Sequence, residues 1–294
     1  MAKKVIVFGG SGFLGSHVSD VLLEAGHEVT IFDLASSSYI QPRQKMIVGD
    51  ILDREKVDEA IKGKDIVYHF AGLADLDDAK TKPFETVSKN IIGTVNILDA
   101  AVSAKIEHFI FASTIYVYSS LGGFYRCSKQ AGELYIEEYQ QRYGLDFTIL
   151  RYGSLYGPRA GNNNGIMRYL SQGLKTGKIT YSGTGEEMRE YIYIKDAAKL
   201  TVDIMSEEKL NRHLIITGHH PMKGNDMLKM INEILDKKVS IEYKIAPGSG
   251  HYGLTPYSFK PKIGSKLVSN LYMDMGQGLL ECLHEIFDDS KNNK

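Results

Sequence analysis

The chain has 294 residues, of which 43% are hydrophobic and 24% are charged, and its formal net charge at pH 7 is -1. This length can bury a large core, and the balanced charge, without a block of Lys or Arg, excludes proteins that bind nucleic acid through a basic surface. No apolar run is long enough to span a membrane, and the two cysteines, Cys127 and Cys282, lack metal-ligand spacing. We therefore expect a cytoplasmic protein with reduced thiols, no bound metal and no membrane contact.

The first half of the chain alternates short apolar runs with longer segments of helical periodicity. The short runs predict strands over residues 5–8, 29–32, 46–48, 66–70, 109–112 and 147–150. The periodic segments predict helices over 13–25, 86–104 and 125–143. Alternation of this kind is typical of an α/β Rossmann fold with a doubly wound parallel sheet.

After Arg151 the alternation loosens, and residues 157–158 and 161–164 have the composition of loops. We interpret residues 1–150 as a Rossmann domain and residues 151–294 as mostly a smaller C-terminal α/β lobe that binds the substrate. A helical pattern over 195–206 could return to the first domain, so we expect the two parts to interleave.

A glycine-rich turn links the first predicted strand to the first predicted helix. Glycines 9, 12 and 15 have GxxGxxG spacing, a variant of the Rossmann fingerprint, which lets the backbone approach a pyrophosphate at the helix N-terminus. Such a triplet is weak evidence alone, but here Asp33 ends the next strand, 18 residues beyond Gly15. The combination predicts a dinucleotide site.

Asp33 also favours one cofactor. A carboxylate at the end of this strand accepts hydrogen bonds from the ribose hydroxyls and repels a 2′-phosphate. No arginine follows Asp33, so we expect NAD rather than NADP. Asp50, after the third strand, could bind the adenine amino group or cap a helix.

Tyr125 and Lys129 form a YxxxK pair within a predicted helix and so share one face of it. A tyrosine has an ordinary pKa of about 10, and a nearby ammonium lowers that pKa and helps the phenol act as a base. Tyr125 could also be an ordinary half-buried tyrosine, but the preceding strand ends in Ser113-Thr114, which makes the catalytic interpretation more specific.

These motifs together resemble the extended short-chain dehydrogenases of the NAD-dependent sugar epimerase and dehydratase family. The matching stretches follow the family's order along nearly the whole chain: Gly9–Gly15, Asp33, Asp50-Ile51, His69-Phe70-Ala71-Gly72, Asn90 with Gly93-Thr94, Ser113-Thr114, Tyr125–Lys129, Arg151-Tyr152, Tyr156-Gly157-Pro158-Arg159 and Arg189-Glu190-Tyr191.

The resemblance implies a role for each matching residue. Tyr125 would be the acid and base on a sugar hydroxyl, commonly that on C4, Thr114 would hydrogen-bond the same oxygen, and Lys129 would tune Tyr125 and anchor the nicotinamide ribose. Cofactor contacts are expected from Gly9, Gly12, Phe13, Leu14, Gly15, Asp33, Asp50, Ile51, Phe70, Ala71, Gly72, Asn90, Ser113, Tyr125, Lys129 and Tyr152. Substrate contacts are expected from Thr114, Ser154, Arg189 and His251.

The residues after Thr114 distinguish the family's reactions. Hexose dehydratases resemble one another in a Thr-Asp-Glu triplet and sugar-acid decarboxylases also place a carboxylate nearby, whereas this chain has Thr114-Ile115-Tyr116. An elimination without its acid and base would be hard to run. We therefore expect a C4 epimerase of nucleotide sugars that works through a transient 4-keto intermediate. An NAD(P)H-dependent 4-keto reductase is the alternative, and Asp33 favours the epimerase because such reductases often use NADP.

A binding-only NAD sensor is a further alternative, since some relatives of this fold act without catalysis. Such relatives typically lose the tyrosine or the lysine, and this chain keeps both Tyr125 and Lys129.

Several positions depart from the family pattern. The loop over 119–124 is short, and Ser154 stands where sugar epimerases have an asparagine. His251 stands near the position of a substrate-binding arginine and could replace it or be an ordinary loop residue. Tyr116 could point into the pocket or pack against Tyr118 and Tyr152. Arg189 is similar to the arginine that grips the diphosphate, although it could instead pair with Glu186 or Glu190.

The predicted helices over 86–104 and 125–143 resemble the pair through which this family dimerises as a four-helix bundle. Tyr135, Ile136 and Tyr139 would suit that contact if they are exposed, or they could belong to the core of the chain. The resemblance implies a homodimer.

Overall fold

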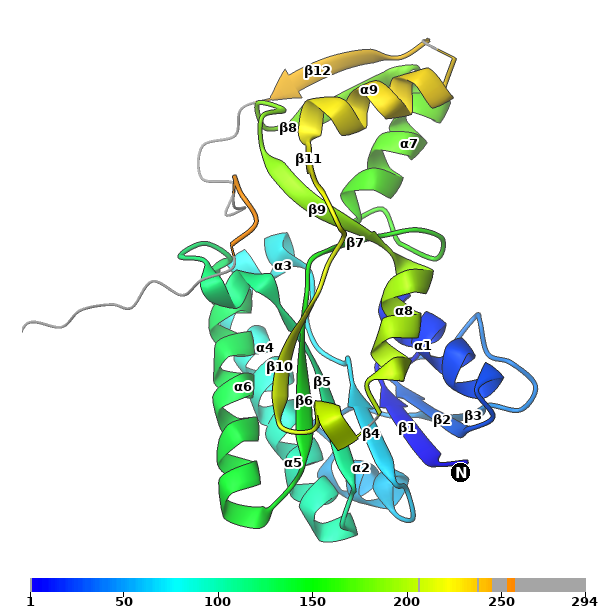
Figure 1. The fold of residues 1–294 in the computed structure, drawn as a ribbon, viewed down its shortest axis with the longest axis vertical. Coiled ribbons are helices and arrows are strands. Elements are labelled where there is room, and N and C mark those ends of the chain that lie inside the picture. Colours follow the sequence, from blue (N-terminus) through cyan, green and yellow to red (C-terminus); the bar gives the residue numbers. More distant parts are fainter. Residues whose placement is uncertain (1, 206, 237, 245–252, 257–294) are drawn as a thin grey trace, which may run out of the picture. The chain divides into compact units, whose positions relative to one another are not determined.

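Seven parallel strands form the central sheet, in the order β10-β6-β5-β4-β1-β2-β3 (Figure 1). Their bounds are β1 Lys4–Phe8, β2 Glu28–Asp33, β3 Lys45–Val48, β4 Ile66–His69, β5 His108–Thr114, β6 Phe147–Tyr152 and β10 Arg212–Ile216. The computed structural model describes residues 2–205, 207–236, 238–244 and 253–256. The chain divides into residues 1–260 and residues 261–294, and only the first of these units contains described residues. The expected doubly wound parallel sheet is confirmed.

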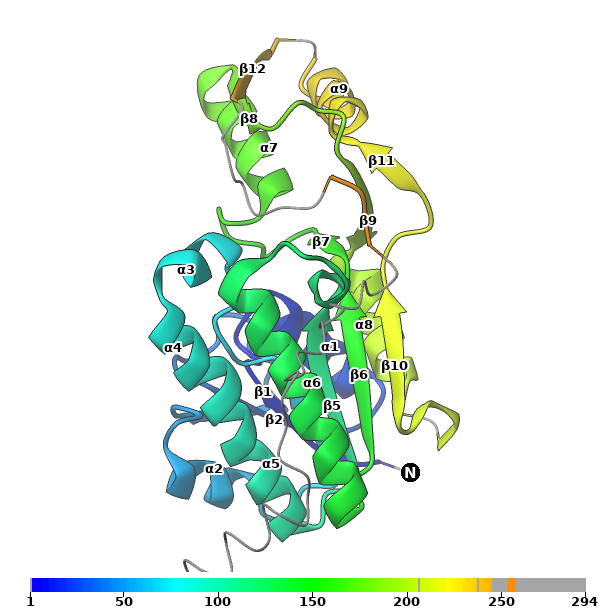
Figure 2. The same ribbon diagram turned by 90° about the vertical axis from the view of Figure 1, so that its left-hand side faces the viewer.

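Helices cover both faces of this sheet because its strands are apolar on both sides. Ile6 and Phe8 of β1 pack in one core with α2 (Arg54–Ile61), α5 (Gly93–Ala104) and α6 (Gly123–Tyr143). Val5 and Val7 pack in a second core with α1 (Phe13–Glu24) and α8 (Ile194–Asp203). The turned view shows α5 and α6 side by side over the first of these faces (Figure 2).

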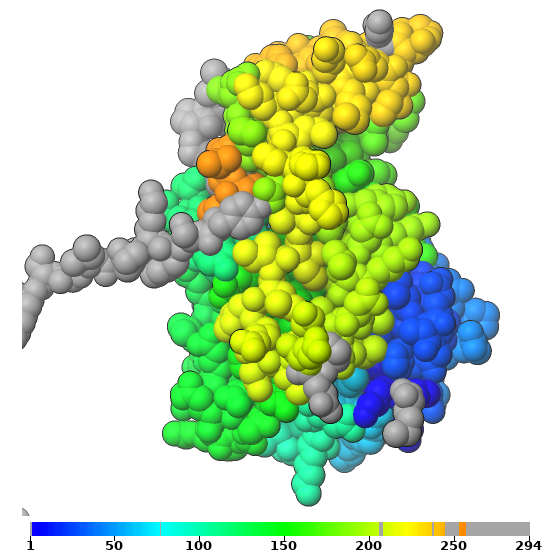
Figure 3. Space-filling model, viewed as in Figure 1, coloured from blue at the N-terminus to red at the C-terminus, as the bar shows by residue number. Residues whose placement is uncertain are grey.

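Two segments from the second half of the chain belong to the layers of this sheet. Strand β10 pairs with β6, with Arg212 opposite Thr148 and Ile216 opposite Tyr152. Helix α8 packs against α1, and the space-filling view shows its yellow-green atoms beside the blue atoms of α1 (Figure 3). Segments 194–203 and 212–216 thus complete a core that begins at Val5 of β1.

The predicted helix over 86–104 is divided in the structure. Helix α4 (Pro83–Val87) is followed by a π-helical turn, Ser88–Ile92, and then by α5. A short helix, α3 (Leu76–Thr81), comes before them. Wide π-turns are often found at functional sites, and this one contains the buried Asn90.

Of the three α6 residues that would suit a dimer contact, one is exposed. Tyr135 lies at the surface, whereas Ile136 is buried in the core. Tyr139 packs against that core, and its hydroxyl donates to the Asp99 carboxylate, at 2.5 Å. Ile136 and Tyr139 therefore serve packing within the chain.

A smaller lobe follows β6. One sheet joins β7 (Ser154–Tyr156), β9 (Met188–Tyr193) and β11 (Pro221–Lys223), and another joins β8 (Lys178–Ser182) to β12 (Ser240–Lys244). Helices α7 (Gly165–Thr176) and α9 (Gly224–Ile234) pack over a separate core that includes Tyr181 and Leu228. Within the described part of the chain, no helix is both long and apolar enough to cross a membrane.

Candidate active site

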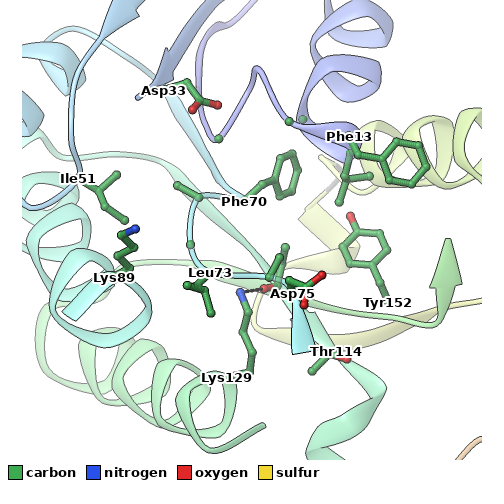
Figure 4. Close-up of a pocket in the computed structure, with 18 of the residues that line it drawn as sticks. Phe13, Asp33, Ile51, Phe70, Leu73, Asp75, Lys89, Thr114, Lys129 and Tyr152 are labelled. Atoms are coloured by element: carbon green, nitrogen blue, oxygen red, sulfur yellow. Dashed lines mark hydrogen bonds between the residues drawn. The ribbon is translucent and has the colours of Figure 1, made fainter. Parts of the chain in front are cut away.

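A pocket of about 680 Å³ opens at the carboxyl ends of the central strands (Figure 4). Ligands of open α/β sheets bind at this edge. Of the residues expected to contact the cofactor, all except Asn90 line the pocket: Gly9, Gly12, Phe13, Leu14, Gly15, Asp33, Asp50, Ile51, Phe70, Ala71, Gly72, Ser113, Tyr125, Lys129 and Tyr152.

The glycine turn forms one wall, and its geometry requires glycine. Gly9 has a φ of +81°, and a Cβ on Gly15 would lie 2.2 Å from the Gly9 carbonyl oxygen. Gly12 precedes α1 as its N-cap, no side chain caps this helix end, and its first turn has no acidic residue. Backbone N–H groups at such a helix start suit an anion such as a diphosphate.

Asp33 lies at the end of β2, and its carboxylate is fixed by the backbone. Its two oxygens accept the N–H groups of Ser11 at 2.9 Å and Leu34 at 2.7 Å. Each carboxylate oxygen has a second lone pair, so Asp33 can also accept hydrogen bonds from ribose hydroxyls. The residues present therefore fit a dinucleotide.

Asp50 lines the same pocket, and it is not the cap of the following helix. Its carboxylate accepts the N–H of Leu52 at 2.9 Å. The N-cap of α2 is Asp53, whose side chain accepts the N–H of Lys56.

Asn90 lies behind the pocket wall. Its side-chain oxygen accepts the N–H of Leu73 at 2.6 Å, and its amide donates to the Leu73 carbonyl at 3.0 Å and to Ser128 Oγ at 2.9 Å. Asn90 thus supports Leu73, which lines the pocket, and Asn90 itself does not line it, so its expected contact with the cofactor stays a prediction.

Thr114 and Lys129 lie at the far end of the pocket from Asp33 (Figure 4), and Tyr125 lines the same pocket. Thr114 ends β5, while Tyr125 and Lys129 lie one turn apart on α6. The hydroxyls of Tyr125 and Thr114 are hydrogen-bonded. The Lys129 ammonium donates to the Ala112 carbonyl at 2.7 Å and lies 5.9 Å from the centroid of the Tyr125 ring.

Burial dominates the protonation of this pair. It raises the pKa of Tyr125 to about 12, and the hydrogen bond with Thr114 only partly opposes it. Burial also lowers the pKa of Lys129 to about 8, against an attraction from the Glu133 carboxylate that raises it. Lys129 is not among the groups that shift the pKa of Tyr125 in this structure, and its ammonium donates to the Ala112 carbonyl.

A buried charged network that the sequence did not indicate lies behind the pair. The Arg151 guanidinium donates to both oxygens of Glu133, at 3.0 and 2.6 Å, and to the Tyr118 hydroxyl at 2.5 Å. Ser113 also donates to Glu133, at 2.5 Å. The spacing of Glu133, four residues after Lys129, could have suggested a shared helix face.

A second pocket, of about 590 Å³, adjoins the first and reaches into the smaller lobe. Both Ser154 and Arg189 line it, as expected for substrate-binding residues. Arg189 is near enough to Tyr181 to lower the pKa of that hydroxyl, although burial raises it overall. The Glu186 carboxylate instead accepts from Lys223 and Asn225. His251 lies outside the described residues.

Tyr116 lines neither of these two pockets. Its ring lies over Gly122, where an added Cβ would be 2.9 Å from Tyr116 Cδ1. The neighbouring Ile115 is buried. Because the two residues after Thr114 are an isoleucine and a tyrosine, they bring no carboxylate to the pocket.

Asp75 lines both pockets and was not predicted from the sequence. A signal was available, because Asp75 follows closely on the carboxyl end of β4, where ligand-binding residues of parallel sheets gather.

The sequence of this chain is similar to those of a known family of proteins. Residues 5–217 match the family described as NAD dependent epimerase/dehydratase. The chain is 32% identical over 251 residues to the UDP-N-acetyl-alpha-D-glucosaminuronate decarboxylase of Bacillus cytotoxicus, covering 76% of this chain and 77% of the relative. It is 30% identical over 235 residues to the dTDP-D-glucose 4,6-dehydratase of Mus musculus, covering 70% and 65%.

Solved structures resemble it as well. The UDP-glucose 4-epimerase of Thermotoga maritima with UDP-glucose has a TM-score of 0.80 at 26% identity and covers 87% of this chain and 90% of its own. The UDP-glucose 4-epimerase of Thermus thermophilus in complex with NAD has a TM-score of 0.77 at 26% identity and covers 89% and 95%.

Proposed function

Because the chain belongs to the NAD-dependent epimerase/dehydratase family, we propose that it is a nucleotide-sugar epimerase that acts at C4. The expected family is confirmed, and so is its cofactor, NAD. The observation that carries the proposal is the position of Thr114, Tyr125 and Lys129 in one pocket with the glycine turn and Asp33. Family membership alone leaves epimerase, decarboxylase and dehydratase reactions open.

The cofactor's parts fit particular residues of the first pocket. The glycine turn before α1 would hold the diphosphate, Asp33 would hold the adenosine ribose, and Lys129 would anchor the nicotinamide ribose. When bound, NAD supplies an acceptor for the hydride of C4, which can then be returned to the other face of the sugar.

Tyr125 and Thr114 would hold the C4 oxygen between their hydroxyls. Tyr125 keeps its proton at neutral pH in this structure, because its pKa is about 12, and it can return that proton to a 4-keto oxygen. The opposite step needs the phenolate. Lys129 would favour the phenolate if its ammonium turned from the Ala112 carbonyl toward the Tyr125 hydroxyl.

The second pocket suits the rest of a nucleotide sugar. Three cationic side chains line it, those of Lys80, Arg168 and Arg189, and a guanidinium binds diphosphate oxygens in a bidentate manner. The sugar would lie where the two pockets join, within reach of the residues that move the C4 proton.

The choice of epimerisation rests on the residues after Thr114. A dehydratase or decarboxylase needs an acid or base beside the reacting carbons, and the positions directly after Thr114, Ile115 and Tyr116, provide no carboxylate. The carboxylate that does line the pocket near Thr114 is that of Asp75, which comes from the segment after β4. A 4-keto reductase would consume reduced cofactor in each turnover, and Asp33 favours NAD over the NADP that such enzymes often use.

We also propose that the protein is a homodimer. Exposed large apolar side chains lie on α4, on the π-turn that follows it and on α6, namely Phe84, Val87, Ile92, Leu134 and Tyr135. Exposed apolar side chains gathered on neighbouring elements commonly mark an interface.

A proton NMR time course of the protein with NAD and a pool of nucleotide sugars tests the function. New anomeric signals from a C4 epimer are expected. A 4-keto-6-deoxy sugar among the products would indicate a dehydratase, and a decarboxylated pentose would indicate a decarboxylase. Either product would contradict the choice of epimerisation that we based on the residues after Thr114.

A further inference from the structure

The Lys129 ammonium lies over the ring of Phe111. Phe111 belongs to β5 and is buried, and Lys129 Nζ is 4.6 Å from the centroid of its ring. The face of an aromatic ring carries partial negative charge, and it attracts a cation that lies within about 6 Å of the ring centroid. The Tyr125 ring is further from the ammonium, at 5.9 Å, so Phe111 provides the closer ring of the two.

The packing of α6 against β5 brings the Phe111 ring close to the helix that carries Lys129. Gly132 lies one turn after Lys129, and a Cβ at Gly132 would be 2.9 Å from Phe111 Cζ. Glycine weakens the interior of a helix, but here it leaves room for the ring. The contact between the ring and the ammonium is therefore built into the packing of these two elements.

Three other groups act on this ammonium or lie against the ring. The Ala112 carbonyl accepts one of the three N–H groups of the ammonium, at 2.7 Å. The Glu133 carboxylate attracts the ammonium, but both of its oxygens also accept from the Arg151 guanidinium, which has the opposite charge. His69 lies against the Phe111 ring, with the two centroids 5.5 Å apart, and burial keeps this histidine neutral.

Charged side chains of neighbouring elements line the same pocket as Lys129. Asp75 and Asp78 come from the segment after β4, and Lys89 comes from the π-turn. These charges are the same in each of the proteins compared below, so they do not contribute to the differences between them.

From the contact with the ring, we propose that Phe111 is a positioning residue that keeps Lys129 in its charged form beside Tyr125. This inference rests on the proposed function, in which the ammonium favours the phenolate. Burial lowers the pKa of Lys129 to about 8, and the ring face opposes this effect because it stabilises the cation. Attraction to a ring face depends less on direction than a hydrogen bond does, so the ammonium can turn from Ala112 toward the Tyr125 hydroxyl and stay over the ring.

The test weakens the negative charge of the ring face and keeps the shape of the ring. Phe111 is replaced by a phenylalanine with fluorine on one or on both meta carbons, because fluorine withdraws electrons from the ring face and is only slightly larger than hydrogen. The full-length protein with NAD bound carries ¹³C at the lysine Cε atoms, and NMR spectra at increasing pH give the pKa of Lys129. The signal of Lys129 is assigned by its loss in Lys129→Met.

We expect the pKa of Lys129 to fall by about half a unit with two fluorines, and by less with one. A desolvated cation–π contact is worth about 1.5 pKa units, and two fluorines remove only part of it. The pH above which kcat falls should move down by the same amount, because the ammonium is then lost at lower pH.

The same two fluorines on Phe109 are the matched control. Phe109 lies two residues earlier on the same strand, is fully buried and packs in the same core, whereas the ammonium lies over the Phe111 ring. This variant should leave the pKa of Lys129 unchanged. An unchanged or raised pKa in the Phe111 variants, or an equal fall in the Phe109 variant, would overturn the role of Phe111. If no sugar is epimerised, the proposed function fails, while the titration still decides whether the ring stabilises the ammonium.

Discussion

Three ionisable side chains at or beside the pocket are shifted toward their neutral forms by burial. The pKa of Tyr125 is raised to about 12, that of Lys129 is lowered to about 8 and that of His69 is lowered to about 3. Loss of hydration disfavours the charged form in each case. At neutral pH the Tyr125 hydroxyl is therefore protonated and Lys129, with a pKa of about 8, is still mostly an ammonium, so the charge that would favour a phenolate is already present beside the ring.

Tyr125→Phe tests the role of that hydroxyl. Loss of the acid and base should lower kcat by about 100-fold or more, whereas NAD affinity should stay within about twofold, since the ring and its packing remain. Steady-state rates and calorimetry measure the two effects. Tyr135→Phe, at an exposed position of the same helix, is the control and should keep full activity. Retained activity in Tyr125→Phe would rule out this mechanism.

Because of His69, we expect the free energy of unfolding to fall in acid. It is buried among Phe8, Phe109 and Phe111, and its Nε2 lies 2.9 Å from Thr94 Oγ1. Its folded pKa of about 3 lies below the ordinary value, so the unfolded chain binds a proton first as the pH falls below about 6.5. The stability it contributes is present above that pH and falls away progressively down to about pH 3.

Urea unfolding of the wild type and of His69→Gln measures this. Between pH 6.5 and pH 5, the free energy of unfolding of the wild type should fall by about 2 kcal/mol more than that of the variant. This difference does not depend on how much stability the substitution itself removes at neutral pH. Equal losses in the two proteins would mean that His69 is not the group responsible.

Among the helices and strands, the sequence predicted those that show a clear local pattern of apolar residues. Strands β1, β2, β4 and β5 are buried apolar runs, and their existence followed from that pattern alone. Strand β10 was not predicted; it lies at the edge of the sheet, and its short apolar run, Leu214–Ile216, is buried only at Ile216. The π-turn that divides the helix over 86–104 contains Asn90, whose side chain is hydrogen-bonded to the backbone of Leu73, and periodicity does not encode such contacts.

The same distinction applies to the candidate site. Its glycine turn, Asp33, Tyr125 and Lys129 belong to motifs with fixed spacing, and the structure brings them to one pocket. Glu133 was missed because its importance comes from a neighbour far along the chain, Arg151, which donates to both of its carboxylate oxygens. Asp75 was missed although it follows closely on the carboxyl end of β4.

Asn90→Ala tests whether the π-turn supports the pocket. The substitution leaves the Leu73 N–H and carbonyl without their partner, and we expect a loss of about 2 kcal/mol in the free energy of unfolding. NAD should also bind more weakly, because Leu73 lines the pocket. Asn90→Asp keeps the acceptor for the Leu73 N–H but places a buried carboxylate oxygen against the Leu73 carbonyl, so it should also lower stability and NAD affinity. Unchanged NAD affinity in the alanine variant would refute the supporting role.

For the molecule as a whole, the proposed dimer rests on exposed apolar side chains of helices α4 and α6. Phe84 is 84% exposed and Leu134 is 66% exposed, which is unusual for large apolar side chains unless another surface covers them. Charged groups are strongly disfavoured at the centre of such interfaces.

The double variant Phe84→Glu, Leu134→Glu should therefore halve the mass measured by light scattering. Leu174→Glu, at a position of α7 that is equally exposed but outside the expected bundle, should leave the mass unchanged. A wild type that is already monomeric, or a dimer that survives the double substitution, would contradict the proposed interface.

The central claim is that a hydrogen leaves C4 of the sugar and returns to the same carbon. Its most direct test supplies the protein with NAD and a nucleotide sugar deuterated at C4, without added reductant, and follows the label by NMR. The account predicts a C4 epimer that retains deuterium at C4, with no accumulation of reduced cofactor. Loss of the label from C4, or a requirement for added reduced cofactor, would contradict it.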